Sequence, residues 1–89
     1  MLIPSYTNQF SRDIKKMLKR GKSERKIKQV IRNLINEKRL DVRYKDHRLA
    51  GNYRGRRECH IEPDWLLIYK TMEDEIIFER TGTHSDLFE

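Results

Sequence analysis

The spacing of apolar residues changes once along this chain, near Tyr44, and that change constrains the fold more than any other feature. Before Tyr44 the apolar residues recur every three to four positions, as on one face of an amphipathic helix. After it they alternate as in half-buried strands, in runs separated by glycines and charged residues. Helices followed by strands predict an α+β domain, a twisted antiparallel sheet with its helices on one side.

The first twenty residues predict a short strand and a helix. The apolar residues around Pro4 suit a strand near a sheet edge, because proline has no N–H to donate to a neighbouring strand. A helix is expected from about residue 8 to 20, capped by Ser5 or Thr7. Gly21 is placed to end this helix in a left-handed conformation.

Ser23 is expected to open a second helix. Its apolar residues follow the spacing of one buried face: Ile27, Val30, Ile31, Leu34 and Ile35. The two helices are joined by a short turn and predict a helical hairpin that packs on the sheet.

Four runs predict the strands, at about residues 48–49, 55–61, 65–72 and 75–80. The Glu73-Asp74 step suits a tight hairpin turn between the last two. Residues 65–69 and 76–78 are apolar on both alternating faces, so these two strands should be central. At 89 residues the chain predicts one domain, spanning residues 1–89, with a small core.

The charge balance predicts a polyanionic partner. Twenty basic and fourteen acidic residues give a net charge of +6, which suits RNA, DNA or an acidic protein, although solubility alone is the alternative. No apolar leader or membrane span is recognisable, so a cytoplasmic protein is expected. Cys59 is the only cysteine and is expected to be a packed thiol rather than a nucleophile.

All three histidines fall between residues 44 and 88, each close in sequence to arginines and a carboxylate. An imidazole gives or takes a proton near neutral pH. RNA cleavage by the 2′-hydroxyl needs a base for that hydroxyl, an acid for the leaving 5′-oxygen and cations for the phosphate. The set that fits these needs is His47, His60, His84, Asp64 and Arg80, and structural histidines are the alternative.

Two other chemistries fit the sequence less well. The histidines lack the close spacing and the paired cysteines that usually indicate zinc, so neither a metal site nor a cofactor is predicted. No serine is flanked by the glycines of a nucleophile elbow, which argues against a serine hydrolase.

Two aromatic residues and three arginines are candidate substrate contacts. Trp65 could stack on a base or pack in the core, and Phe88 could stack or pack on the sheet edge. The glycine-bounded turn at residues 51–55 is followed by more basic residues. Phosphate contacts or solubility are the two interpretations of its arginines: Arg54, Arg56 and Arg57.

The second half resembles the YafQ branch of the RelE/ParE toxin superfamily. The resemblance rests on Tyr-Lys-Asp-His at 44–47, a Gly-to-Gly-Arg segment at 51–56, Cys-His-Ile-Glu-Pro-Asp-Trp-Leu-Leu-Ile-Tyr at 59–69 and Glu-Arg-Thr-Gly-Thr-His-Ser-Asp-Leu-Phe at 79–88. It implies a RelE-like fold and the toxin of a bacterial type II toxin-antitoxin pair. Such an mRNA interferase cuts mRNA in the ribosomal A site without a metal.

Seven positions of the family's active site fall on matching residues: His47, His60, Asp64, Trp65, Arg80, His84 and Phe88. We expect His84 to be the general acid, with His60 and Asp64 on the base side. His47 would assist and Arg80 would neutralise the phosphate. The resemblance also implies an acidic antitoxin as partner, with operator DNA reached only through that antitoxin.

Two functions from other classes remain as alternatives. ParE-like members of the superfamily poison gyrase, but they typically lack this histidine set. A basic module that binds RNA or DNA without cutting it would have purely structural histidines. Supercoiling and RNA-cleavage assays would separate these functions.

Overall fold

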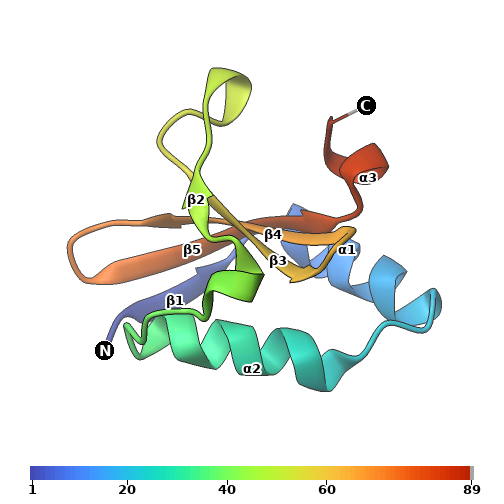
Figure 1. The fold of residues 1–89 in the computed structure, drawn as a ribbon, viewed down its shortest axis with the longest axis horizontal. Coiled ribbons are helices and arrows are strands. Elements are labelled where there is room, and N and C mark those ends of the chain that lie inside the picture. Colours follow the sequence, from blue (N-terminus) through green and yellow to red (C-terminus); the bar gives the residue numbers. More distant parts are fainter. Residues whose placement is uncertain (89) are drawn as a thin grey trace.

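The computed structural model describes residues 1–88, and its helices precede most of its strands as the apolar spacing predicts (Figure 1). The elements in chain order are β1 (Ile3–Tyr6), α1 (Asn8–Lys19), α2 (Glu24–Ile35), the 3₁₀ turn η1 (Val42–Tyr44), β2 (His47–Arg48), the 3₁₀ turn η2 (Gly51–Tyr53), β3 (Arg57–Glu62), β4 (Trp65–Thr71), β5 (Glu75–Gly82) and α3 (His84–Phe88).

The strands form one five-stranded sheet in the order β1-β5-β4-β3-β2. The pairs among β2 to β5 are antiparallel as predicted, and Met72 N donates to Glu75 O at 2.9 Å across the predicted tight turn. The prediction is wrong at one edge, because β1 pairs with β5 in parallel, from Ile3 opposite Glu75 to Tyr6 opposite Phe78. Segments so far apart in sequence carry no local signal for their pairing.

Local capping explains where α1 and α2 begin and end. Thr7 rather than Ser5 caps α1, since its hydroxyl accepts from Phe10 N at 2.9 Å. Ser23 caps α2 in the same way, and Gly21 between the helices has the predicted positive φ, +89°. Both caps therefore confirm the boundaries expected from the sequence.

The two faces of the sheet are covered differently (Figure 1). Helices α1 and α2 lie over one face, and their apolar stripes pack against alternate strand residues: Phe10, Met17, Ile27, Val30 and Leu34 against Cys59, Trp65, Leu67, Tyr69, Ile76 and Phe78. The other face carries a smaller cluster of Leu66, Ile68 and Leu87, with Leu49 and Tyr53 at its margin. This second face is the one that α3 partly covers.

Cys59 is fully buried, as expected for a packed thiol, and burial raises the pKa of its thiol.

Within residues 1–88, no helix has the length and apolar character needed to cross a bilayer.

Candidate active site

The three histidines form one row on the sheet face opposite α1 and α2. Strand register places His47 opposite Glu58 and His60 opposite Leu66, so both imidazoles lie on the face that carries Leu66. His84 begins α3 above the same face. The ring centroids are 6.2 Å apart for His47 and His60, and 5.8 Å apart for His60 and His84. The structure thus brings the predicted histidines together.

Glu58 is a site residue that the sequence reasoning missed. Its side chain is almost fully buried, and Oε1 lies 3.2 Å from His60 Nε2 and 3.6 Å from His47 Nε2. Glu58 is therefore placed to form an ion pair with either imidazole when that ring is protonated. The available signal was the two-residue spacing of Glu58 and His60, which puts both side chains on one face of a strand.

His47 is oriented from its other side by the backbone. Its Nδ1 lies 2.6 Å from Lys45 O, and because a carbonyl only accepts, that nitrogen carries a proton. Lys45 has a left-handed conformation, with φ of 48° and ψ of 44°, at the end of η1. Few residues with a side chain adopt this conformation, so the turn is specifically shaped to hold His47.

Asp64 pairs with His84 and not with His60, which corrects the expected grouping. Asp64 lies in the turn between β3 and β4, and its Oδ1 accepts from His84 N at 2.9 Å and lies 2.6 Å from His84 Nδ1. These bonds, the backbone one first, hold the pKa of Asp64 below its usual value. Glu58 takes the place beside His60 that was expected for Asp64.

The short helix that carries His84 is fixed at both ends of its first turn. Thr83 and Asp86 form a reciprocal capping box, with Thr83 N donating to Asp86 Oδ2 at 2.9 Å and Asp86 N donating to Thr83 Oγ1 at 3.2 Å. Asp86 also accepts from Arg20, the C-cap of α1, at 2.7 Å, which lowers the pKa of the carboxyl well below its usual range. A Cβ on Gly82 would lie 2.9 Å from Asp86 Cβ, so only glycine lets α3 sit this close.

Arg80 lies on the histidine face, opposite Ile68 of β4. Its Nε donates to Asp13 Oδ2 at 2.8 Å, and this hydrogen bond raises the pKa of the guanidinium. Asp13 is a buried residue of α1, and it also accepts from Thr81 N at 3.2 Å, beyond the point where β1 stops pairing with β5. Asp13 therefore fixes Arg80 and offsets part of its charge.

The two candidate aromatic residues have different environments. Trp65 is fully buried and its Nε1 donates to Thr81 Oγ1 at 2.9 Å, so its packing interpretation holds and the expected contact with a nucleotide is wrong for this conformation. Phe88 is 46% exposed and its ring lies edge-on to that of Tyr53. The distances between ring centroids are 5.5 Å from Phe88 to Tyr53 and 6.5 Å from Phe88 to His84. Phe88 thus extends the row of rings begun by the histidines.

The three candidate arginines line one hollow together, but none of the histidines lines it. Arg57 pairs with Tyr69 on the helix-covered face and binds Asp46 at 3.2 Å, so it lies away from the histidines. Arg56 donates to Glu79 at 2.8 Å. Arg54 is exposed at the end of η2. Of the three, only Arg54 has no carboxylate partner among residues 1–88.

Across residues 1–88, no group of three or more His, Cys, Asp or Glu side chains has the arrangement of a metal site. The acidic groups nearest the imidazoles are instead engaged with them by hydrogen bonds or ion pairs.

Sequence comparison identifies relatives over almost the whole chain. A family model described as the bacterial toxin of the type II toxin-antitoxin system, YafQ, matches residues 2–89. The mRNA interferase toxin YafQ of Escherichia coli K12 is 48% identical over 84 residues, which are 93% of this chain and 91% of that protein.

Solved structures show the same fold. The crystal structure of the Escherichia coli DinJ-YafQ complex matches with a TM-score of 0.93 and 44% identity, covering 100% of both chains. A metal-bound toxin from Helicobacter pylori matches with a TM-score of 0.92 and 38% identity, covering 99% of this chain and 100% of that one.

Proposed function

The chain belongs to the YafQ family of bacterial type II toxins, whose characterised activity is that of an mRNA interferase, and we propose that it cuts mRNA in the ribosomal A site. The observation that carries this proposal is the row of three imidazoles on one sheet face. Glu58 lies beside the His60 ring, and Asp64 accepts from the His84 ring. Such a row supplies a base and an acid within reach of one phosphate.

His60 is the proposed general base. Glu58 lies beside His60 Nε2, so in the tautomer protonated there Nδ1 has a lone pair for the 2′-hydroxyl proton. As that proton leaves, O2′ forms a bond to phosphorus. Glu58 then stabilises the imidazolium that results, since its carboxylate is 3.2 Å from the ring.

His84 is the proposed general acid. Asp64 accepts from His84 Nδ1 and orients the ring, so that a proton on Nε2 can pass to the leaving 5′-oxygen. The bond from phosphorus to O5′ breaks, and the products are a 2′,3′-cyclic phosphate and a free 5′-hydroxyl. No group outside the RNA and the protein is needed to balance this step.

Arg80 is the proposed cationic group for the phosphate, and His47 assists it. Arg80 stays protonated beside Asp13, and His47 keeps Nε2 toward Glu58 at the opposite end of the row. Charge that develops on the phosphorane oxygens would be stabilised by these fixed donors. A metal ion is not required for this route.

We propose a cognate acidic antitoxin as the protein partner, acting in the cytoplasm. The Escherichia coli relative was crystallised as a DinJ-YafQ complex, and a net charge of +6 suits an acidic partner. Any contact with operator DNA would be made through that antitoxin.

Primer extension on an mRNA paused on purified ribosomes tests this function. The wild-type protein is compared with His84→Ala and with Ser85→Ala, an exposed neighbour on α3, as the matched control. Cuts at A-site codons by wild type and Ser85→Ala, and none by His84→Ala, are expected. A chelator of transition metals that leaves ribosomal Mg²⁺ in place should change nothing.

Two results would contradict the proposal. Loss of cutting with the chelator would indicate metal-dependent chemistry, which the metal-bound Helicobacter pylori relative makes worth testing. Intact message in every lane would contradict the nuclease itself, and gyrase supercoiling would then be measured.

A further inference from the structure

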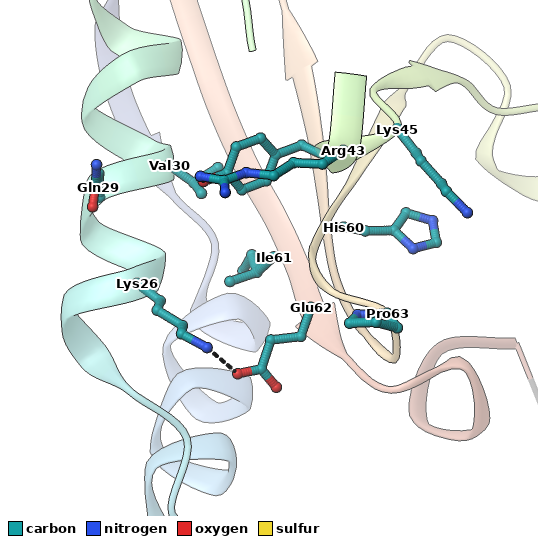
Figure 2. A pocket seen from close by; sticks show the side chains of 10 residues that line it. Lys26, Gln29, Val30, Arg43, Lys45, His60, Ile61, Glu62 and Pro63 are labelled. Carbon is teal, nitrogen blue, oxygen red and sulfur yellow. Dashed lines mark hydrogen bonds and ion pairs between the residues drawn. The ribbon is translucent and has the colours of Figure 1, made fainter. Parts of the chain in front are cut away.

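A hollow of about 580 Å³ lies between α2 and the end of β3, beside the histidine row (Figure 2). One wall is α2, with Lys26, Gln29 and Val30, and the other is the η1 turn with the residues that follow it. His60 lines it from β3, so the hollow borders the proposed general base. Its volume falls in the range of sites for small molecules or single nucleotides.

The hollow is cationic. Arg43 and Lys45 are exposed on its rim, and neither has an ion-pair partner among residues 1–88. Its one carboxylate, Glu62, is already shared by Lys22 at 2.7 Å and Lys26 at 2.9 Å, and these lysines hold its pKa below the usual value. The carboxylate is therefore more than neutralised, and the hollow attracts an anion.

Arg43 and Tyr44 form a cation–π pair in this hollow, called the platform below. The guanidinium carbon of Arg43 lies 5.0 Å from the centre of the Tyr44 ring, and Arg43 Nη2 donates to the Tyr44 hydroxyl at 3.1 Å. In Figure 2 the Arg43 side chain extends from η1 toward Val30 of α2. Guanidinium planes and aromatic rings are the usual surfaces on which single-stranded bases stack.

The same turn also shapes the active site. The carbonyl of Lys45 accepts from His47 Nδ1 at 2.6 Å, while the Lys45 side chain lies beside His60 at the mouth of the hollow (Figure 2). Strand β2 pairs only with Arg57 and Glu58, so the rest of that edge of β3 has no strand partner in the described part of the chain. A strand of RNA leaving the histidine row along this edge would enter the hollow.

We propose that this hollow is a subsite for the single-stranded message next to the scissile phosphate. A base stacks on the platform of Arg43 and Tyr44, and the neighbouring phosphates contact Lys45 and Lys26. The inference rests on the proposed function, because only a substrate threaded through the histidine row would be placed here. An acidic segment of an antitoxin would match the charge, but the stacking platform and the position beside His60 favour RNA.

Charge reversal tests the subsite. Arg43→Glu and Lys45→Glu are compared with Arg25→Glu, which makes the same change at an exposed position of α2 outside the hollow. Single-turnover cleavage is measured against the concentration of paused ribosomes. For Arg43→Glu and Lys45→Glu we expect half-saturation at an about tenfold higher ribosome concentration than for wild type. Arg25→Glu should resemble wild type, and thermal melting should show all three folded. Equal effects at all three positions, or none at any, would overturn the subsite.

Photocrosslinking identifies what occupies the hollow. The probe is p-benzoylphenylalanine in place of Arg43, bound to a ribosome whose message carries one 2′-deoxynucleotide at the cut. A crosslink to a message nucleotide beside that cut is expected. If wild type cuts the message but residue 43 crosslinks only to ribosomal RNA, or only to an added antitoxin, the subsite is wrong and the proposed function stands. If wild type leaves the message intact, both fail.

Discussion

On the helix-covered face of the sheet, β4 contributes Trp65, Leu67 and Tyr69, whereas on the other face it contributes Leu66 and Ile68 beneath the histidines. The first set belongs to a core of thirteen buried residues, and the second to a cluster of three. Most of the apolar area removed from water therefore lies on one face. The other face, which has the smaller buried apolar cluster, is the one that carries the three histidines.

This division teaches that neighbouring residues of one strand have different tasks. Successive strand residues point to opposite faces, so His60 faces the site and Ile61 the core although they are adjacent. Substitutions on the histidine face should change rate more than stability, and substitutions on the helix-covered face should do the reverse.

The largest expected effect is loss of catalysis on replacing His60. His60→Ala removes the proposed general base and should slow single-turnover cleavage by about 10²- to 10⁴-fold. The thermal midpoint should change less than for a core substitution, because His60 is not one of the residues of the main apolar core. Cleavage at the wild-type rate, or unfolding at room temperature, would break the contrast between the faces.

Leu67→Ala should have the opposite profile. Leu67 is fully buried against the helices, and its truncation should lower the free energy of unfolding by about 2–5 kcal/mol. Urea denaturation measures this loss, and Leu67→Met serves as the milder control. The cleavage rate per folded molecule should be unchanged. A large fall in that rate would show that the core face also sets the chemistry.

Trp65→Phe distinguishes packing from nucleotide stacking. It removes the indole N–H that donates to Thr81 Oγ1, so stability should fall by about 1–3 kcal/mol while cleavage persists. The change in the free energy of unfolding, from urea denaturation, is compared with the change in kcat/KM for cleavage. Unchanged stability with a tenfold lower kcat/KM would restore Trp65 as a substrate contact.

Asp86→Asn should give a smaller effect that depends on pH. The pKa of Asp86 is lower in the folded protein than in the unfolded chain, so its ionisation stabilises the fold above the unfolded value of about 4. This contribution is lost as the pH falls toward the folded pKa. Wild type should therefore be the more stable at pH 7, and the two proteins should converge below about pH 4 in urea denaturation. A constant difference at every pH would exclude the Arg20 ion pair as its cause.

The smallest effect concerns Cys59. Because burial raises the pKa of this thiol, a thiol reagent at pH 8 should react with it only as fast as the protein opens. Reaction measured in denaturant supplies the control rate. Rapid labelling of the native protein would show that the helix-covered face is not sealed.

Short-range patterns were sufficient for much of the fold. The caps at Thr7 and Ser23 and the glycine between the helices follow from local rules, and they lie where the sequence puts them. The α3 helix was missed, although Thr83 and Asp86 have the spacing of a capping box that signals a helix start. Its five residues are too few for an apolar period to be seen.

The candidate site was less predictable because its pairings are made across the fold. Asp13 meets Arg80 from another element, and Asp64 meets His84 rather than the histidine nearer to it in sequence. Whether Trp65 faced the core or a ligand depended on which face of β4 the helices cover. Residue type alone identified the histidines, but it did not identify which carboxylate lies beside His60 or His84.

The parallel pairing of β1 with β5 has a consequence for how the chain acquires its structure. The two strands are about as far apart along the chain as any two elements, so their union requires closing a very long loop. Folding dominated by such non-local pairing is slow, on the order of milliseconds to seconds. Until β1 docks, the edge of β5 beside Ile76 and Phe78 is open to the same edge of another molecule. Refolding yield should therefore fall as the protein concentration rises.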